Sequence, residues 1–451
     1  MIVLILFSLY SFSFKINLET RFTFSKDLDG DGKKEIIFLH PDKKLSIFSN
    51  SEKGFIEILK GVEISKEGCI IDFGDFYPEE KGEEIIIAKS NGIDIFKFNK
   101  NISLINSFNF QNSPIYSTNK VLRKGKILYK ENLIFFYPDK GILIYKNGNF
   151  DTIKVLTEID VSTSDDKGDY GIPKKSSLNT LYILPLLFFE DINGDGEEDL
   201  IEYSKDSLFI FFKKGKKFSK SRDMVIDLSF LKGEGKIPLP PKDIVVTDIN
   251  NDKRADLLLT KLGEIFFGTK SIIYFFLNQN GGFKNTPDQV IISESSLPDV
   301  KVLDLNNDGN MDLITNMTPL NIWTIIKLLL TKKEEITYGF YLFKNSSFSK
   351  TPDFTKKLTL RIDIQKEESE GEIEIFDFDR DNFYDIIYFK MDELIIYKGM
   401  GEKGFSEKPF ISFKIQTSPN YILDDFNNDN KTDALFFKNE NKETKVWGFF
   451  Q

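Results

Sequence analysis

The sequence predicts an all-β protein in the form of a β-propeller, a ring of blades that each contain four short antiparallel strands. Three observations lead to this fold class. A short acidic motif recurs six times along the 451 residues, short runs of β-branched and aromatic residues flank every copy, and four such runs fill each repeat. The 45 Phe and 16 Tyr residues also favour strands. Four strands per repeat is the plan of a propeller blade.

The motif places Asp, Asn or Glu at its first, third, fifth and ninth positions. Its six copies occupy residues 27–35, 191–199, 248–256, 304–312, 377–385 and 425–433. One internal spacing that recurs along a whole chain indicates a repeat architecture. A degenerate copy over residues 75–84 is one residue longer and lacks the middle carboxylates.

The rhythm of the apolar runs predicts eight blades. Residues 126–156 show the same succession of strands without an acidic loop, so we interpret them as a blade that has lost its motif. A seven-bladed ring with this stretch as an insertion is the alternative. The last unit supplies three strands, which leaves residues 15–22 to add the outer strand and close the ring. A Phe is expected to open the fourth strand in five units: Phe55, Phe218, Phe283, Phe348 and Phe405.

Composition narrows the classes of function. The 60 Lys and Arg residues stand against 70 Asp and Glu, a formal net charge of −10, which argues against nucleic-acid binding. The single cysteine, Cys69, excludes an intrachain disulfide framework and a cysteine-based zinc cluster. The single histidine, His40, excludes most histidine-dependent metalloenzymes and a Ser-His-Asp triad.

The N-terminus predicts export. Residues 2–10 form a short apolar run, and Ser11, Phe12 and Ser13 follow in a small-x-small pattern that suits signal peptidase. We therefore expect a signal peptide over residues 1–13 and one propeller over residues 14–451, in a secreted, periplasmic or cell-surface protein. The alternative for the apolar run is a first β-strand. The run is too short to span a bilayer, and we expect no transmembrane segment in the mature chain.

The acidic loops predict calcium (Ca²⁺) sites, up to six. Carboxylates packed so closely repel one another, and calcium relieves this repulsion by taking six to eight oxygen ligands at about 2.3–2.6 Å. Positions 1, 3 and 5 would supply side-chain oxygens, position 7 a backbone carbonyl and position 9 another carboxylate. The predicted metal residues are Asp27, Asp29, Asp31, Lys33, Glu35, Asp191, Asn193, Asp195, Glu197, Asp199, Asp248, Asn250, Asp252, Arg254, Asp256, Asp304, Asn306, Asp308, Asn310, Asp312, Asp377, Asp379, Asp381, Phe383, Asp385, Asp425, Asn427, Asp429, Lys431 and Asp433.

Two other interpretations of these loops were weighed. An EF-hand shares the first part of the pattern, but it needs flanking helices and a Glu at position 12, whereas both flanks here are predicted strands. Metal-free hairpin turns also favour Asp, Asn and Gly. Three loops have Gly at position 6, and Lys253, Asn382 and Asn430 replace it in the others. Six calcium ions would change the formal charge from −10 to −10 + 12 = +2.

The motif Asp-x-Asp/Asn-x-Asp-Gly-x-x-Asp-Leu resembles the FG-GAP/VCBS repeat, which is found in integrin α-subunit propellers and in many secreted bacterial proteins. The resemblance covers nearly the whole mature chain. It implies a propeller whose loops bind calcium and whose body binds other molecules. It does not identify the ligand, because one fold hosts many functions.

Strand alternation separates two faces of the predicted ring. The acidic motifs all join first and second strands, whereas the long connections leave from the other face, over residues 157–180, 230–242, 317–335 and 354–371. Long loops on a rigid scaffold are where binding concentrates. One of them predicts a helix over residues 318–331, with Thr318 as N-cap and Pro319 as first helical residue. The helix would either pack on the propeller or dock a partner or membrane.

The resulting functional hypothesis is an exported, calcium-stabilised propeller that binds a protein or a glycan on the face opposite the calcium loops. We expect no catalytic activity. A polysaccharide lyase is one alternative, because some calcium propellers that resemble this one are lyases; it needs a base and a cation near the sugar carboxylate. An architectural component of the cell envelope is another.

Overall fold

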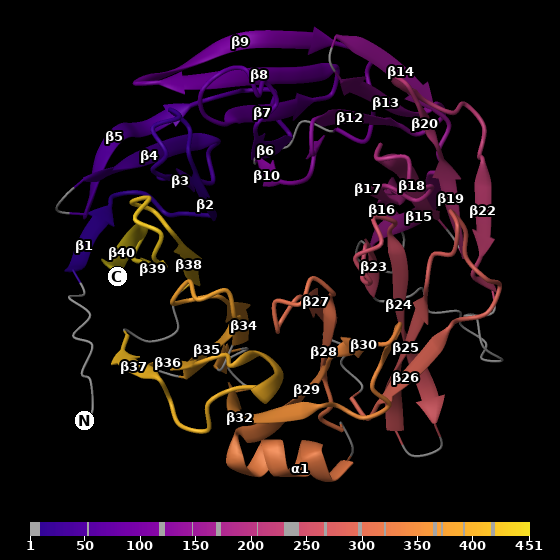
Figure 1. Ribbon diagram of the computed structural model, residues 1–451. Helices are drawn as coiled ribbons and strands as arrows, with labels where there is room; N and C mark the ends of the chain where they lie inside the picture. The colour runs from indigo at the N-terminus through magenta and orange to yellow at the C-terminus, as the bar shows by residue number, and fades with distance from the viewer. Residues whose placement is uncertain are drawn as a thin grey trace.

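The computed structural model describes residues 10–51, 54–116, 122–146, 148–167, 173–204, 206–229, 243–265, 268–295, 300–319, 322–363, 368–370, 373–390, 393–415 and 420–451. Within these residues, eight antiparallel blades of four strands follow one another around a ring (Figure 1), and two of the blades carry one added strand. The eight-bladed prediction is confirmed, and the seven-bladed alternative is wrong. The stretch without an acidic motif forms a blade of its own.

The strands of each blade follow chain order from the inside of the ring outwards (Figure 1), with two exceptions: the first strand of the chain joins the last blade, and the added strand of blade 2 pairs in parallel with that blade's first strand. Blades 1 to 4 consist of β2 (Phe22–Lys26), β3 (Glu35–Leu39), β4 (Lys44–Ser51) and β5 (Gly54–Glu63); β6 (Ile70–Gly74), β7 (Glu84–Lys89), β8 (Gly92–Asn99) and β9 (Asn101–Asn109), with β10 (Arg123–Lys124) added; β11 (Leu128–Tyr129), β12 (Asn132–Tyr137), β13 (Gly141–Lys146) and β14 (Asn149–Ile153); and β17 (Leu186–Glu190), β18 (Asp199–Ser204), β19 (Ser207–Phe211) and β22 (Met224–Asp227).

Blades 5 to 8 consist of β23 (Asp243–Thr247), β24 (Asp256–Ile265), β25 (Gly268–Phe276) and β26 (Gln289–Ser293); β27 (Val300–Leu303), β28 (Asp312–Asn316), β29 (Lys333–Tyr341) and β32 (Phe354–Asp363), with β33 (Glu368–Glu370) added; β34 (Ile373–Phe376), β35 (Asp385–Lys390), β36 (Glu393–Tyr397) and β37 (Ile411–Lys414); and β38 (Asn420–Asp424), β39 (Asp433–Glu440), β40 (Glu443–Phe450) and β1 (Tyr10–Ile16).

The outer strand of blade 8 comes from the N-terminal end of the chain. β1 pairs antiparallel with β40, from Tyr10 opposite Phe450 to Ile16 opposite Thr444. The predicted outer strand over residues 15–22 is therefore placed too late. The reason is side-chain alternation, because Phe12 and Ile16 are buried from this register. Phe22 instead begins blade 1.

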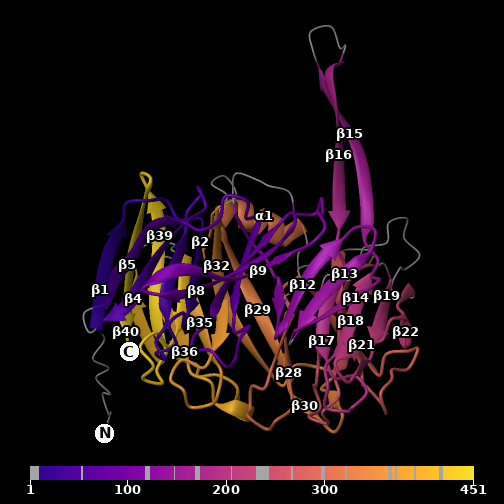
Figure 2. The same ribbon diagram turned by 90° about the horizontal axis from the view of Figure 1, so that it is seen from above.

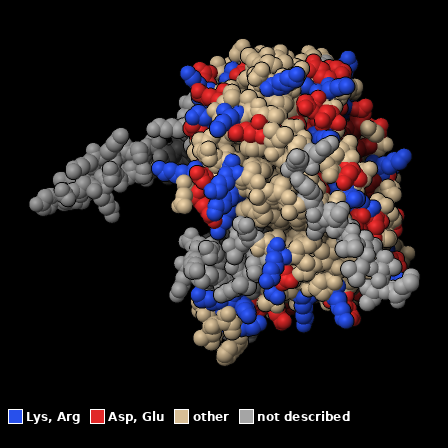
Figure 3. Space-filling model, turned by 90° about the vertical axis from the view of Figure 1, so that its left-hand side faces the viewer, with Lys and Arg blue, Asp and Glu red and all other residues tan. Residues whose placement is uncertain are grey.

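The second strands of the blades are the most deeply buried, on both of their faces. All five residues of β3 and all six residues of β12 and β18 are buried. A neighbouring blade covers each face of such a strand, which explains why these segments are continuous apolar runs. On the outer surface, Lys and Arg side chains are interspersed with Asp and Glu (Figure 3).

The predicted role of the recurring Phe residues is confirmed in blade 1 only. Phe55 lies in β5, the fourth strand of that blade. Phe218 and Phe348 instead lie in short hairpins before the fourth strand, formed by β20 (Lys213–Lys214) with β21 (Lys217–Phe218) and by β30 (Phe343–Lys344) with β31 (Ser347–Phe348). Both side chains are buried. Phe283 and Phe405 also precede the fourth strands of their blades, and η3 (Gly401–Lys403) lies just before Phe405.

The long connections differ in structure. Residues 157–180 belong mostly to a two-stranded hairpin of β15 (Glu158–Lys167) and β16 (Pro173–Ile183), which projects from one face of the ring (Figure 2). Residues 354–371 are not an irregular loop, since β32 continues ten residues to Asp363 and pairs with β33. The connection over residues 230–242 lies outside the described residues.

The helix α1 (Ile322–Thr331) begins later than predicted. Thr318 is not its N-cap, because the Thr318 hydroxyl accepts a hydrogen bond from the Thr337 N–H at 2.8 Å. Pro319 forms an isolated bridge with Ser295 instead of opening the helix. α1 lies on the same face as the β15–β16 hairpin (Figure 2). Among the described helices, none is long and apolar enough to cross a membrane.

One buried carboxylate between blades 3 and 4 predicts a pH effect on stability. Burial raises the pKa of Glu202 to about 7, above the unfolded value of 4.5. Its Oε1 accepts the Leu156 N–H at 2.6 Å, while Oε2 lacks a hydrogen bond in the described structure. The free energy of unfolding therefore falls as the pH rises from 4.5 to 7, because Glu202 ionises more easily in the unfolded state than in the folded state.

We expect Glu202→Gln to stabilise the protein at pH 8 by about 1–2 kcal/mol, a value discounted for residual solvent screening. The gain should vanish well below pH 4.5, where Glu202 is protonated in both states. Urea unfolding at the two pH values measures it. An equal effect at both would show that the charge of Glu202 is not the cause.

Candidate metal-binding loops

All six acidic motifs occupy the same place in their blades. Each one connects the first strand to the second, as residues 27–35 connect β2 to β3 and residues 425–433 connect β38 to β39. The ninth position begins the second strand every time. The degenerate copy over residues 75–84 also lies between first and second strands, β6 and β7.

The backbone takes the same path in every loop. Position 6 is left-handed whether the residue is Gly, Asn or Lys, with φ values of 86° at Gly32 and 70° at Lys253. Position 4 is left-handed as well, with φ values of 72° at Gly30 and 59° at Arg380. The sequence analysis found the first of these turns and missed the second. Gly or Asn at position 4 in five of the six copies was the available signal.

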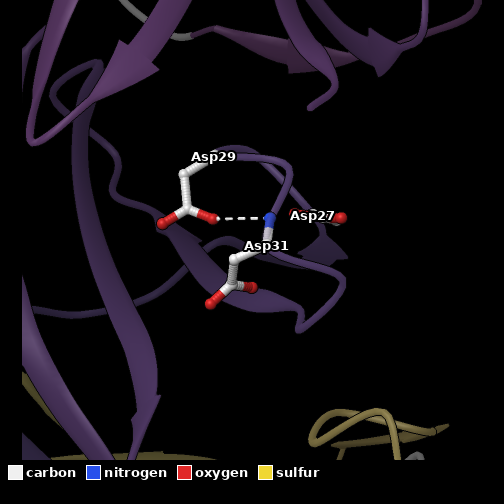
Figure 4. Close-up of side chains that lie close together, drawn as sticks. All are labelled: Asp27, Asp29 and Asp31. Atoms are coloured by element: carbon white, nitrogen blue, oxygen red, sulfur yellow. Dashed lines mark hydrogen bonds between the residues drawn. The ribbon is translucent and has the colours of Figure 1, made fainter. Parts of the chain in front are cut away.

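The first and fifth side chains are turned back into every loop, where their oxygens accept backbone N–H groups, and the third does so in five of the six loops. In the first loop the Gly32 N–H donates to Asp27 at 3.0 Å and the Lys33 N–H to Asp31 at 2.7 Å. The Asp31 N–H donates to Asp29 at 3.2 Å, as Figure 4 shows. The bonds from position 6 to position 1 and from position 7 to position 5 recur in the other five loops.

Two loops bring three carboxylates within reach of a single ion. One oxygen each of Asp27, Asp29 and Asp31 lie within 4.8 Å of one another, and so do oxygens of Asp377, Asp379 and Asp385. The other four loops have Asn at position 3, so an amide oxygen would take that place. Oxygens of this kind and spacing are the ligands that calcium prefers. The predicted side-chain ligands therefore fit a hard cation.

Position 9 has a structural role that the sequence analysis missed. In the fifth blade the Asp256 carboxylate is fully buried, and it accepts the Ile249 N–H at 2.9 Å and the Asn278 N–H at 2.8 Å. Burial raises its pKa to about 7. The equivalent carboxylates are also fully buried and accept the N–H of position 2 in their own loops: Glu35, Asp199, Asp312, Asp385 and Asp433.

Position 7 was expected to offer a backbone carbonyl. The structure places these residues, Lys33, Glu197, Arg254, Asn310, Phe383 and Lys431, where their N–H groups donate to position 5. The role of their carbonyls as ligands stays a prediction.

Lysine ammonium groups reach several of these first-to-second-strand loops. In the fourth-blade loop, Lys213 pairs with Glu197 and Lys130 pairs with Glu198. Lys398 pairs with Asp379 and, at 2.9 Å, with Asp381, positions 3 and 5 of the seventh-blade loop. In the degenerate loop, Lys97 pairs with buried Glu84 and donates to the Gly82 carbonyl at 2.7 Å. An ammonium thus neutralises carboxylates in the loop that lacks the middle ligands. Sequence spacing alone gave no signal of these lysines.

Neighbouring loops are bonded to one another around the ring. The Lys34 N–H of blade 1 donates to the Phe426 carbonyl of blade 8 at 3.0 Å, and the Met311 N–H of blade 6 donates to the Ile249 carbonyl of blade 5 at 2.8 Å. The loops therefore form a connected rim. An ion bound in one loop would stiffen a blade and its contact with the next.

The rim and the long connections lie on opposite faces. The hairpin β30–β31 shares the rim face, because the Phe343 N–H donates to Asp312 of the acidic loop at 2.9 Å. Figure 2 shows β30 at the lower edge, and α1 and the β15–β16 hairpin at the upper edge.

Comparison with known proteins agrees with this architecture. A family model described as the FG-GAP-like repeat matches residues 248–315, which include the loops of blades 5 and 6. No curated protein sequence matches the chain. The repeat match and the eight blades both agree with the resemblance to an FG-GAP repeat propeller, and the match itself covers residues 248–315.

Several solved structures are similar to this chain. A lectin of Agrocybe aegerita, described as recognising non-reducing terminal N-acetylglucosamine, is 16% identical, with 96% of this chain and 86% of that chain covered and a TM-score of 0.44. The WD40 domain of SCAP from fission yeast is 10% identical, with 98% and 94% covered and a TM-score of 0.45.

Proposed function

We propose that this protein is an exported, calcium-stabilised binding module. The observation that carries the calcium part is the shared geometry of six loops: two left-handed residues, and carboxylates at positions 1 and 5 that accept N–H groups of their own loop. Two of the loops also gather three carboxylates. Calcium would supply charge neutralisation and join the first strand of a blade to the second. The loop residues hold the ion, and the buried ninth carboxylate keeps the loop closed.

The binding part of the proposal places a protein or glycan ligand on the face of the long connections. A rigid ring that carries long segments on one face is the arrangement in which loops commonly recognise partners. In this account the calcium ions stabilise the scaffold and do not touch the ligand. A screen of calcium-loaded protein against glycan and protein arrays tests the proposal, and it fails if no ligand of either class is retained.

The same screen separates the alternatives. A polysaccharide lyase would shorten an acidic polysaccharide and produce unsaturated ends that absorb in the ultraviolet. An envelope component would bind no array ligand and would fractionate with the cell wall or membrane. Export is tested by fractionating cells that express the full chain, since the predicted signal peptide over residues 1–13 requires a shortened protein outside the cytoplasm. That cleavage would remove Tyr10–Ser13 from β1, so an exported protein that keeps these residues would favour the alternative of a first β-strand.

Calcium stoichiometry should distinguish a complete loop from the degenerate one. Asp195→Ala removes an exposed ligand from the fourth-blade loop, and we expect one calcium ion fewer per chain in equilibrium dialysis. Asp75→Ala is the matched control. It should leave the count unchanged, because Glu84 in that loop already pairs with Lys97. An equal loss in both variants would contradict this ranking.

A further inference from the structure

Blade 3 lacks a buried apolar side chain that the other seven blades share. In those blades the second residue of the connection between first and second strands is apolar and at most 6% exposed: Leu28, Phe76, Ile192, Ile249, Leu305, Phe378 and Phe426. In blade 3 only Lys130 and Glu131 separate β11 from β12. This connection is too short to supply the apolar residue.

The short connection leaves a cavity between blades 3 and 4, where β14 lies beside the β20–β21 hairpin (Figure 1). Residues of both blades line it: Asn132, Ile144 and Lys146 from blade 3, and Glu198, Lys213 and Lys216 from blade 4. The depression measures about 370 Å³ out to open solvent. Within it, about 20 Å³ can hold a group of the size of a water molecule or a hydroxyl.

Asn132 brings an unsatisfied acceptor to this cavity. It begins β12, the place that the ninth-position carboxylate has in the blades with a motif, and it is only 2% exposed. Its Nδ2 donates to the Tyr129 carbonyl at 3.2 Å, which orients Oδ1 away from that carbonyl. In the part of the chain that the structure describes, Oδ1 accepts no hydrogen bond. The donor in the motif blades is the N–H of the second loop residue, which blade 3 lacks.

The Glu198 N–H is a donor at the same place. At the equivalent loop position, the Lys34 N–H donates to the Phe426 carbonyl at 3.0 Å and the Met311 N–H to the Ile249 carbonyl at 2.8 Å, each in the neighbouring blade. Blade 3 has no residue to supply that carbonyl, and the Glu198 N–H has no backbone acceptor among the described residues. The cavity thus offers one acceptor and one donor, which a single hydroxyl satisfies.

A strongly basic segment borders the cavity. Residues 213–222 contain five Lys, one Arg and no Asp or Glu, in a protein whose formal net charge is −10. Lys213 pairs with Glu197, whereas the exposed Lys216 has no ion pair among the described residues. An exposed ammonium beside a cavity favours an anionic group on the ligand.

The other charged groups that line the cavity are paired within the protein: Lys146 with Glu131, Glu198 with Lys130, and Asp151 with Lys220. The Asp151 carboxylate also accepts the Phe218 N–H at 3.0 Å. Among the described residues, the charge that the cavity leaves for a ligand is therefore the positive charge of Lys216.

We propose that this cavity binds one sugar residue of an acidic saccharide, with a uronate as the matching chemistry. A uronate carries hydroxyls and a carboxylate on one ring. One hydroxyl takes the place of the missing apolar residue, where it donates to the Asn132 Oδ1 and accepts the Glu198 N–H. The carboxylate meets the ammonium group of Lys216, a charge-assisted contact. A neutral sugar or a simple carboxylate provides only one of these two functions.

This saccharide site belongs to the rim face. The Lys213 N–H, beside the cavity, donates to Asp199 of the fourth-blade acidic loop at 2.9 Å. The long connections that carry the proposed binding face lie on the other side of the ring (Figure 2). The inference therefore goes beyond the proposed function and does not depend on it.

Isothermal titration of the calcium-loaded full chain tests the proposal with three small probes. Glucuronate has the hydroxyls and the carboxylate, glucose lacks the carboxylate, and acetate lacks the hydroxyls. We expect glucuronate to bind about tenfold more tightly than glucose or acetate, and its affinity to fall with added salt. A glucuronate tetrasaccharide then assigns the source: tighter binding than the monosaccharide supports a polysaccharide chain as ligand, and equal binding supports a single sugar residue.

Two variants and a matched control locate the binding. Asn132→Leu removes the acceptor and fills the cavity, so it should lower glucuronate affinity about tenfold without lowering the melting temperature. Lys216→Gln should lower the affinity about fivefold. Lys217→Gln is the matched control, because Lys217 is exposed in the same hairpin but does not line the cavity. Its affinity should stay within about twofold of the native value.

Absence of glucuronate binding by the native protein, or equal binding of glucose, would overturn the proposal and leave water as the occupant of the cavity. Unchanged affinity in Asn132→Leu would also overturn it. If Asn132→Leu does not fold, the two lysine variants decide. Equal losses in Lys216→Gln and Lys217→Gln would mean that the basic hairpin attracts anions without a site.

Discussion

Chelating calcium should lower the melting temperature of the protein by about 3 °C for every site that was occupied. When the free calcium concentration is about a hundred times the Kd of a site, binding at that site stabilises the native state by about 2.7 kcal/mol. For a chain of 451 residues the unfolding entropy scales to about 0.9 kcal/mol per kelvin near 60 °C, which converts that energy into the stated shift. Six occupied loops would give a total near 18 °C, the largest effect we expect.

Thermal unfolding with and without EDTA measures this shift. Excess calcium should restore the melting temperature, whereas magnesium should restore little of it, because magnesium demands a regular octahedron of ligands. A melting temperature that does not respond to EDTA would mean that the loops are metal-free turns.

The second large effect is expected from the buried ninth position. Asp256→Ala removes the acceptor of the Ile249 and Asn278 N–H groups, which leaves two buried donors without partners. Each such donor costs about 1–3 kcal/mol, so we expect a loss of about 2–6 kcal/mol. Because the loss comes from the protein's own hydrogen bonds, it should persist in EDTA. Denaturant unfolding measures it.

Asp252→Ala is the matched control in the same loop. The Asp252 side chain is exposed. Its Oδ1 accepts the Arg254 N–H at 2.9 Å and its Oδ2 accepts the Asn250 amide at 3.1 Å, and neither donor is buried. This variant should lose stability in calcium and change by about 0.5 kcal/mol or less in EDTA. If Asp256→Ala also became harmless in EDTA, the ninth carboxylate would act through the metal alone.

The blade plan was predictable because it depends on local spacing. The motif marks the connection between first and second strands in six blades, and its degenerate copy marks a seventh. The succession of apolar runs supplies the eighth. Residues 126–156 lack the motif, but they show the same succession of apolar runs as the other blades. The start of α1 was less predictable, because Thr318 and Pro319 contact Thr337 and Ser295, which are distant in sequence.

The features that the sequence did not predict depend on contacts between residues that are far apart in the chain. The position of β1 is set by its register with β40, more than 400 residues away. Phe218 and Phe348 are buried in short hairpins, so their aromatic character did not mark a fourth strand. Lys97 and Lys398 neutralise loop carboxylates from other strands and loops, a charge pairing that no motif records.

The central claim is that the six loops bind calcium, and a direct count of ions per chain tests it most directly. The protein is equilibrated with calcium, separated from free ions by gel filtration, and analysed by inductively coupled plasma mass spectrometry. The account predicts bound calcium, up to six ions for the six motifs, with one fewer in Asp195→Ala. A native protein that retains no calcium would contradict it.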